Sequence, residues 1–315
     1  MSDRLLVGFD FGGTKLAVVL ADRDGTRLAS RVLPTDAERG AEQAVHRAIA
    51  ASRELLAERG GAVTAVGVAT MGITRDDHVE LAPNVPGWDR LALPGMLREE
   101  FATAPVVIEN DVKAAAVAEL TWGELRDVST GIYVNLGTGL AVALIVGGTV
   151  LEGANGAAGE IGYWARSRAD EPGSRAVRGP LEEYASGAGV AARARNELGI
   201  DGGVAALTRS EDPRAAAFLA DLYDEIALHV ANLAIALDPE RVVLGGGYAR
   251  SSDRLLATVA KRLDAHVPYP PQLRVARFGG DAAAAGAVAL ALGQGERARG
   301  AGQGKMTPNA RLQPG

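Results

Sequence analysis

The chain of 315 residues is long enough for one large or two medium-sized domains, and 47% of its residues are hydrophobic, which allows a substantial core. It contains no cysteine, which excludes disulfides and thiolate nucleophiles or metal ligands. The net charge of −6 disfavours nucleic acid or an anionic membrane as a partner. Because neither a long uncharged apolar run nor a signal pattern is present, we expect a cytoplasmic protein.

The first hundred residues contain strand-like apolar runs and one helical pattern. The strands are predicted at Leu5–Phe9, Ala17–Ala21, Leu28–Val32, Val63–Val68 and Val106–Ile108. A helix from about Glu42 to Glu58 separates the third strand from the fourth. Three consecutive strands followed by helix and strand alternation indicate an α/β layer with a meander edge.

The second half repeats this order. Strands are predicted at Gly131–Asn135, Leu140–Val146 and Val242–Leu244, and a long helix with apolar steps of three and four residues ends at Asp238-Pro239. From about Gly293 onward, Gly, Arg, Gln and Pro replace the periodic pattern, so we expect a solvated tail. The architecture is therefore duplicated, although the sequence hardly is.

Three glycine turns follow predicted strands. The first, Asp10 to Lys15, would expose backbone N–H groups, a hydroxyl and an ammonium that can hold phosphate, although an ordinary hairpin has the same pattern. The second, Gly137 to Gly139, also carries a hydroxyl, and two such turns could grip one polyphosphate. The third, Gly245 to Gly247, allows either close approach to an adenosine or simply a sharp turn.

Three carboxylates are candidates for contact with a ligand. Asp111 follows the strand that ends at Ile108 and opens an alanine-rich helix, where a ligand-facing acid is expected. It could instead cap the helix, but Asn110 could serve that role equally well. Glu160 lies in a glycine-rich loop and Glu182 in a second short segment; either acid could also be a solvated surface carboxylate.

The order of motifs DFGGTK, NVPGW, IENDVKAAAVAEL, NLGTGL, GANGAAGEIG, LEEYASG, LDPERVVLGGG and GDAAAAGAVALAL resembles the ROK family of bacterial sugar kinases and repressors, from residue 5 to about 292. The resemblance implies an α/β, actin-like ATPase (ribonuclease H-like) fold with two α/β domains and an interdomain cleft. Residues 1–112 would form the small domain, completed by a C-terminal helix at about 282–292. Residues 113–281 would form the large domain, and 293–315 a disordered tail.

The resemblance also implies a site for ATP, Mg²⁺ and a sugar. Asp10 would hold Mg²⁺ through water, and Asp111 would be the general base. The nucleotide would be bound by Gly12, Gly13, Thr14 and Lys15, by Gly137, Thr138 and Gly139, and at the adenosine by Gly245, Gly246 and Gly247. The sugar would contact Asp111 together with Gly72, Asn84, Asn110, Glu160, Tyr163 and Glu182.

The chain departs from the zinc-containing members of the family. Tyr163 stands where those members carry a His, and Ser174 to Pro180 stand where they carry a cysteine-rich stretch, so we expect no zinc. Tyr163 would offer a phenol to the substrate or only fill space. The segment Arg166 to Arg178 would lack a metal to order it and stay mobile until ligand binds.

These observations predict an ATP-dependent kinase that phosphorylates a hydroxyl, most simply the primary one, of a hexose or hexose analogue. The alternative acceptors are an aminohexose of the kanosamine type and a C7-cyclitol of antibiotic biosynthesis, which the missing zinc favours. By family analogy we expect a homodimer or homotetramer.

A non-catalytic, sugar-sensing ROK regulator is the competing class, and a sugar-binding protein that has lost catalysis is a further one. The regulators carry a helix-turn-helix domain ahead of the first phosphate loop, whereas nine residues precede Asp10 here. The retained Asp111 and the two phosphate turns favour the kinase.

Overall fold

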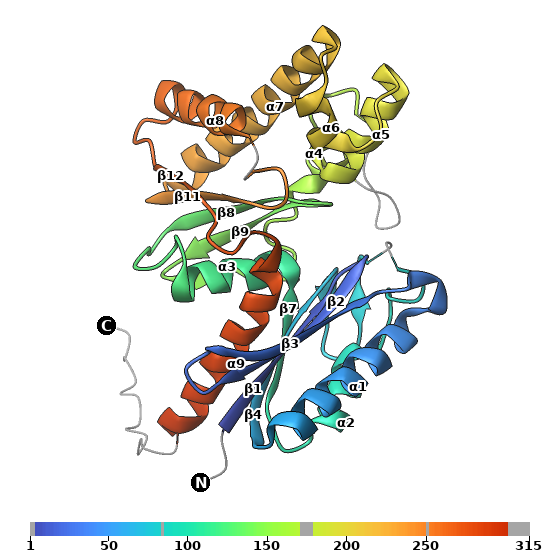
Figure 1. Cartoon of the computed structure of the whole chain (residues 1–315). Helices are drawn as coiled ribbons and strands as arrows, with labels where there is room; N and C mark the ends of the chain where they lie inside the picture. The colour runs from blue at the N-terminus through green and yellow to red at the C-terminus, as the bar shows by residue number, and fades with distance from the viewer. Residues whose placement is uncertain (1–3, 83–84, 171–178, 250–251, 302–315) are drawn as a thin grey trace, which may run out of the picture.

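The computed structural model describes residues 4–82, 85–170, 179–249 and 252–301. Its framework is two five-stranded sheets of the same design, one above the other in Figure 1. In the described residues no helix combines the length and the apolar character that crossing a bilayer demands.

The first sheet has the strand order β3-β2-β1-β4-β7. Its strands are β1 (Arg4–Phe11), β2 (Lys15–Asp22), β3 (Arg27–Pro34), β4 (Ala62–Thr70) and β7 (Val106–Asn110). The first three form an antiparallel meander, and β4 and β7 run parallel to β1. The carboxyl ends of β1, β4 and β7 therefore lie at one edge, where ligands bind in open α/β sheets.

The second sheet repeats this topology in the order β10-β9-β8-β11-β12. Its strands are β8 (Gly131–Leu136), β9 (Leu140–Val146), β10 (Thr149–Val150), β11 (Arg241–Gly245) and β12 (Gln272–Val275). The β8–β9–β10 meander is antiparallel, while β11 and β12 are parallel to β8. The predicted duplication of architecture is confirmed, as is each predicted strand.

The helices divide into three groups (Figure 1). Helices α1 (Ala41–Arg59) and α2 (Leu93–Glu100) cover one face of the first sheet. Helices α3 (Asp111–Trp122) and α9 (Ala282–Ala301) lie between the two sheets. The outer face of the second sheet is covered by α4 (Pro180–Ala185), α5 (Gly187–Leu198), α6 (Gly203–Arg209), α7 (Pro213–Leu237) and α8 (Asp253–His266).

Shorter elements connect these layers. They are the pair β5 (Ile73–Thr74) and β6 (Val79–Glu80), and the 3₁₀ turns η1 (Ala37–Arg39), η2 (Ile161–Tyr163) and η4 (Gly279–Asp281).

Helix α9 packs closely enough that glycine is needed at its contacts. A Cβ on Gly67 of β4 would lie 1.9 Å from the carbonyl oxygen of Ala287, and a Cβ on Gly286 would lie 2.1 Å from that of Ala114 in α3. Any larger residue would push α9 off the sheet or off α3. The C-terminal helix is thereby fixed against the N-terminal sheet.

This helix is longer than the sequence predicted. It continues to Ala301, so residues 293–301 are helical and not part of a tail. Once the packed turns of α9 have formed, adding one more residue to the helix orders the backbone of that residue alone. Ala, Arg and Glu are good helix formers and favour this extension despite the intervening glycines. The rest of the predicted tail, 302–315, lies outside the described residues.

Candidate active site

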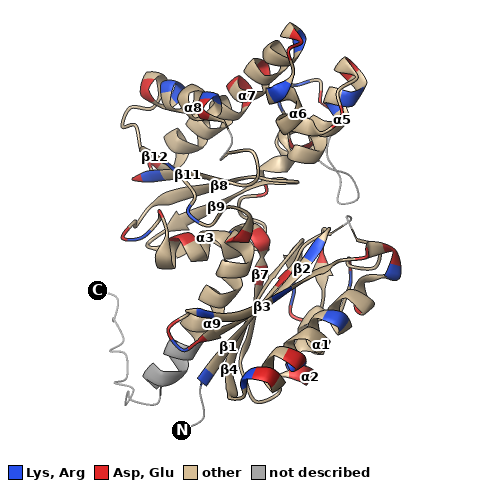
Figure 2. Cartoon of the chain, viewed as in Figure 1, with Lys and Arg blue, Asp and Glu red and all other residues tan. Residues whose placement is uncertain are grey.

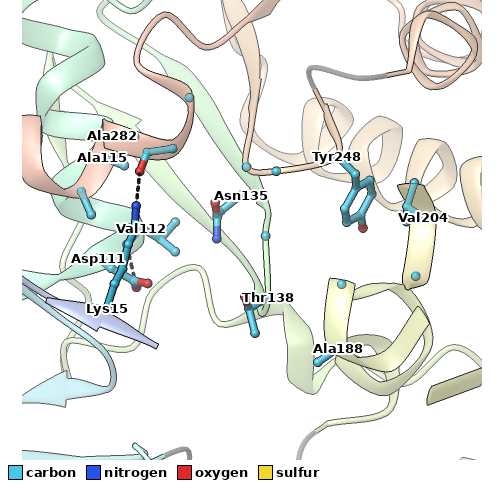
Figure 3. A pocket seen from close by; sticks show the side chains of 18 of the residues that line it. Lys15, Asp111, Val112, Ala115, Asn135, Thr138, Ala188, Val204, Tyr248 and Ala282 are labelled. Carbon is cyan, nitrogen blue, oxygen red and sulfur yellow. Dashed lines mark hydrogen bonds between the residues drawn. The ribbon is translucent and has the colours of Figure 1, made fainter. Parts of the chain in front are cut away.

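Two adjoining cavities open between the sheets. The larger cavity has a volume of about 650 Å³ and the smaller cavity about 480 Å³. Their shared wall is formed by Lys15, Asp111, Val112, Asn135 and Thr138. Figure 3 shows Lys15, Asp111, Asn135 and Thr138 around the larger cavity, with Tyr248 and Val204 at its far end. A ligand in each cavity would meet the other at this wall.

The first glycine turn joins β1 to β2 and divides its residues between the cavities. Asp10 lines the larger one, Gly12, Gly13 and Thr14 line the smaller one, and Lys15 lines both. The N–H of Gly12 donates to the carbonyl of Lys15 at 3.0 Å, and a Cβ on Gly12 would lie only 2.9 Å from that oxygen. The Lys15 ammonium donates to the Gly280 carbonyl at 3.4 Å, which places it at η4, just before α9.

Asp10 is buried, with 8% of its surface exposed. Burial, and next the negative charge of Asp111, raise the pKa of its carboxyl to about 7, while Lys15 acts in the opposite direction. A carboxylate in such surroundings gains strongly from a cation, because the cation offsets both the lost hydration and the neighbouring charge.

The second turn, between β8 and β9, is held by the start of α5. The N–H of Gly187 donates to the carbonyl of Gly137 at 2.8 Å, and the N–H of Ala188 donates to that of Thr138 at 3.1 Å. Gly137 lines the larger cavity, Gly139 the smaller one and Thr138 both. The two predicted phosphate turns therefore reach the same shared wall from different sheets.

The third turn is only partly at the cavity. Gly246 and Gly247 line the larger cavity, whereas Gly245 lines neither cavity. A Cβ on Gly245 would lie 2.2 Å from the hydroxyl of Tyr133, so packing accounts for glycine there. Sequence patterns also missed much of this cavity, because other parts of its wall come from strand β8 and from distant turns and helix starts: Tyr133, Gly202, Gly203, Val204, Tyr248, Gly279 and Gly280.

Asn110, rather than Asp111, is the residue that caps helix α3. The side-chain oxygen of Asn110 accepts from the N–H of Lys113 at 2.8 Å, which confirms the capping role considered for it. Asp111 Oδ1 accepts from the adjacent Val112 N–H at 2.9 Å, and the backbone N–H of Asp111 itself also contacts this carboxylate. Desolvation, and next the charge of Glu182, raise the pKa of Asp111 to about 6. Figure 2 shows acidic residues where α3 begins, between the sheets.

The smaller cavity gathers the predicted sugar-binding side chains. It is lined by Gly72, Asn110, Glu160, Tyr163 and Glu182, and its apolar wall includes Met71, Ile73, Leu81 and Leu140. Asn84 lies outside the described residues. Gly72 has a φ of +81° and its Cβ would lie 2.4 Å from the Glu80 carbonyl, so only glycine suits this position.

Hydrogen bonds orient the acids of this cavity. Asn110 Nδ2 donates to Glu160 Oε1 at 3.3 Å, and the Leu140 N–H donates to Glu182 Oε1 at 3.4 Å. Burial, and next the charge of Asp111, raise the pKa of Glu160 to about 7, while Lys113 lowers it. The cavity thus presents a wall of carboxylate and amide acceptors that suits a polyhydroxylated ligand.

The segment after Tyr163 is held by an arginine–aromatic cluster formed by Arg166, Tyr184, Arg193, Asp221 and Glu225. The Arg166 guanidinium lies 3.3 Å from the Tyr184 ring centroid, and its Nε donates to Glu225 at 2.8 Å. Arg193 covers the same ring at 3.8 Å, and the Tyr184 hydroxyl donates to Asp221. Side chains thus supply contacts to Arg166 in place of a metal, while residues 171–178 lie outside the described residues.

Comparison with known proteins identifies the family of this chain. The sequence model of the ROK family matches residues 6–294. A glucokinase of Halalkalibacterium halodurans is 29% identical over 312 residues, covering 90% of this chain and 93% of that protein. The solved structure of a ROK hexokinase from Thermus thermophilus is 29% identical with a TM-score of 0.80, covering 93% of this chain and 99% of the other.

A second solved structure, a ROK family glucokinase from Streptomyces griseus in complex with glucose and AMPPNP, is 28% identical with a TM-score of 0.72, covering 91% and 99% of the two chains. The chain belongs to the ROK family and has its actin-like ATPase fold. Within that family it is a sugar kinase, a phosphotransferase with an alcohol group as acceptor.

Proposed function

We propose that the larger cavity binds ATP, that the smaller cavity binds a hexose or hexose analogue, and that Asp111 is the general base. The observation that carries this proposal is the position of Asp111 in the wall that the two cavities share. The Streptomyces griseus relative, solved with a nucleotide analogue and a sugar together, supports two ligands in this fold. The phosphoryl group would cross from one cavity to the other beside this carboxylate.

In the proposed step the primary hydroxyl oxygen of the sugar attacks the terminal phosphorus of ATP, and the bond from that phosphorus to ADP breaks. Asp111 accepts the hydroxyl proton. Its pKa of about 6 makes it a stronger base than an ordinary aspartate, while it stays largely ionised near neutral pH. Lys15 and the backbone N–H groups of the two phosphate turns face the charge on the phosphates.

Magnesium fits the donor set at Asp10. In the parts of the chain that the structure describes, no group of three His, Asp or Glu side chains could hold a metal ion. A metal at Asp10 would therefore take most of its ligands from phosphate and water, as Mg²⁺ commonly does. When bound there, Mg²⁺ would neutralise phosphate charge during transfer.

The acceptor is best sought among compounds that bear several hydroxyls. We propose a hexose as the first candidate, since Asn110, Glu160 and Glu182 offer several acceptors in one cavity. Tyr163, which is 37% exposed, lines the same cavity and can contact a substituent on the ring. An aminohexose of the kanosamine type and a C7-cyclitol remain in the panel to be tested.

The experiment is an ADP-release assay with MgATP over glucose, N-acetylglucosamine, kanosamine and a C7-cyclitol. We expect turnover with at least one acceptor, and kcat/KM ranks them. Calorimetric binding of each sugar, measured in parallel, gives the control. Binding without turnover for the whole panel would instead favour a sugar-binding protein that has lost catalysis.

A further inference from the structure

A buried lysine lies directly behind the proposed sugar site. Lys113, in the first turn of α3, has 1% of its side chain exposed. Its ammonium donates to the carbonyl oxygens of Gly156 at 2.5 Å and Glu152 at 3.3 Å, and it lies 3.9 Å from Glu109 Oε1. None of the sequence motifs predicts a role for this residue.

Burying the charged ammonium of Lys113 costs free energy, because the charge loses its hydration. A charge removed from water is stabilised only by good partners, and an apolar side chain in its place is often the more stable choice. Lys113 has partners suited to its charge: two carbonyls of the loop between β10 and η2, and a carboxylate on β7. Such an arrangement indicates that Lys113 fixes the loop between β10 and η2 in position.

The loop in question carries Glu160. Within it, the N–H of Ala158 donates to the Glu152 carbonyl at 3.2 Å and the N–H of Gly156 donates to that of Gly153 at 3.3 Å, so the Glu152–Ala158 turn is a compact unit. From the turn the chain passes directly to Glu160, whose carboxylate accepts from Asn110 at 3.3 Å. The start of α3 therefore binds this loop at two points, through Lys113 in its first turn and through its N-cap residue Asn110.

The charges around Lys113 also support this positioning role. The carboxylates of Glu109 on β7 and Glu160 in the loop both interact with the charge of Lys113, so the ammonium lies behind an acidic pair of side chains. Burial raises the pKa of both Glu109 and Glu160, and Lys113 opposes the rise in each case. Arg75 holds the outer side of the loop through the Asn155 carbonyl at 2.8 Å.

We propose that Lys113 is a positioning residue for the sugar: its buried ammonium fixes the Glu152–Gly156 turn against α3 and thereby places Glu160 beside Asn110 and Asp111. The inference rests on the proposed function, because it takes the smaller cavity as the sugar site. Lys113 lines neither the larger nor the smaller cavity and contacts no proposed ATP-binding residue in the hydrogen bonds and ion pairs described. Its loss should therefore affect the sugar and spare ATP.

The first variant is Lys113→Met, which keeps most of the buried stem and removes the charge and the donors. We expect KM for the sugar to rise roughly tenfold or more, with KM for ATP within about twofold of the wild-type value. The matched control is Lys261→Met, which removes an exposed lysine from α8 and should leave both constants unchanged. An unchanged sugar KM in Lys113→Met would overturn the proposal.

A chemical rescue distinguishes the effect of the ammonium charge from the effect of side-chain packing. Because the chain contains no cysteine, a thiol reagent modifies the introduced cysteine alone. Lys113→Cys, alkylated with 2-bromoethylamine in denaturant and refolded, regains an ammonium on a side chain of nearly the length of lysine. We expect the alkylated protein to recover the sugar KM to within roughly threefold, whereas the free-thiol variant does not. Wild-type protein carried through the same denaturation is the control. Equal sugar KM values before and after alkylation would refute the role of the charge.

Sugar binding and ADP release by the wild-type protein distinguish a failure of the proposed kinase reaction from a failure of the positioning role of Lys113. Sugar binding by calorimetry without any ADP release would contradict the proposed kinase reaction. The dissociation constant for the sugar then takes the place of KM, and a Lys113→Met protein that binds sugar as tightly as wild type would overturn the positioning role. Where Lys113→Met does not fold, the comparison of free-thiol and alkylated protein decides.

Discussion

Asn110 and Glu160, fifty residues apart, are joined by a hydrogen bond of 3.3 Å from Nδ2 to Oε1. The same amide uses its oxygen to cap α3 through the Lys113 N–H. One side chain thus fixes the helix that begins with Asp111 and also orients an acid that comes from the second half of the chain. Asn110 therefore helps to position both the proposed base, Asp111, and the proposed sugar-binding acid, Glu160.

Asp111→Asn should reduce kcat by roughly 10² to 10⁴-fold, because the amide cannot accept the hydroxyl proton. The dissociation constant of the sugar should stay near the wild-type value, since the other side chains of the smaller cavity remain. Steady-state kinetics and calorimetry measure the two quantities. Asp253→Asn, which changes the equivalent first residue of α8, is the matched control and should leave kcat unaltered. Wild-type turnover in Asp111→Asn would remove the base assignment.

The pH profile of kcat/KM for the sugar, at saturating MgATP, should fall on the acid side with a midpoint near 6. Asp111 must be ionised to act as the base, and its pKa is raised to about 6, so protonation removes activity about tenfold per pH unit below that value. An ordinary aspartate would give a midpoint near 4. The residual activity of Asp111→Asn should lack this inflection. A wild-type profile that stays flat down to pH 5 would contradict the expectation.

Asp10→Asn should make the nucleotide-free protein more heat-stable at pH 8 while it weakens or abolishes turnover. The folded-state pKa of Asp10 is raised from 3.8 to about 7, so folding favours the protonated form. The resulting destabilisation develops as pH rises from about 4 to 7 and is complete above 7. The gain in Tm should be on the order of 5 °C at pH 8 and vanish below pH 4. Thermal melts at both pH values test it; a lower Tm at pH 8 would disagree.

Arg166→Ala should raise KM for the sugar by roughly three- to tenfold with little change in KM for ATP. Arg166 stacks on Tyr184 and pairs with Glu225, and these contacts anchor the chain that follows Tyr163 at the smaller cavity. Arg195→Ala, which removes an exposed ion pair between Arg195 on α5 and Asp201 beyond the end of that helix, is the control and should leave both KM values unchanged. Equal sugar KM values for the two variants would show that the cluster does not influence the site.

Gly286→Ala and Gly293→Ala change the same residue type in the same helix and should have opposite effects. A Cβ at Gly286 would lie 2.1 Å from the Ala114 carbonyl, so α9 must move away from α3, at a cost of about 3 kcal/mol. Gly293 has nothing within 4 Å of its Cβ position, and alanine there should stabilise by about 0.5–1 kcal/mol. Denaturant unfolding measures both. A Gly286→Ala protein as stable as wild type would contradict the packing described.

Local patterns predicted much of the fold and part of the site. The hairpin at Asp10–Lys15, the turn at Gly137–Gly139 and the cap at Asn110 all follow from interactions within a few residues, which periodicity and residue type reveal. Gly245 and Gly246 look alike in sequence, but only Gly246 lines the cavity. The direction in which each glycine faces depends on Tyr133 and on the rest of the second sheet.

By itself the sequence determined the two repeated α/β halves and the place of Asp111 at the start of a helix, because strand and helix periods and capping preferences are local. Only the tertiary structure decided that Lys113 is buried, since its carbonyl partners at Glu152 and Gly156 lie 39 and 43 residues away. In an alanine-rich helix a lysine is ordinarily a surface residue. Lys113 lies behind the proposed sugar site because the loop folds onto it. Whether a charged side chain is buried or exposed depends on the partners that long-range packing brings near it.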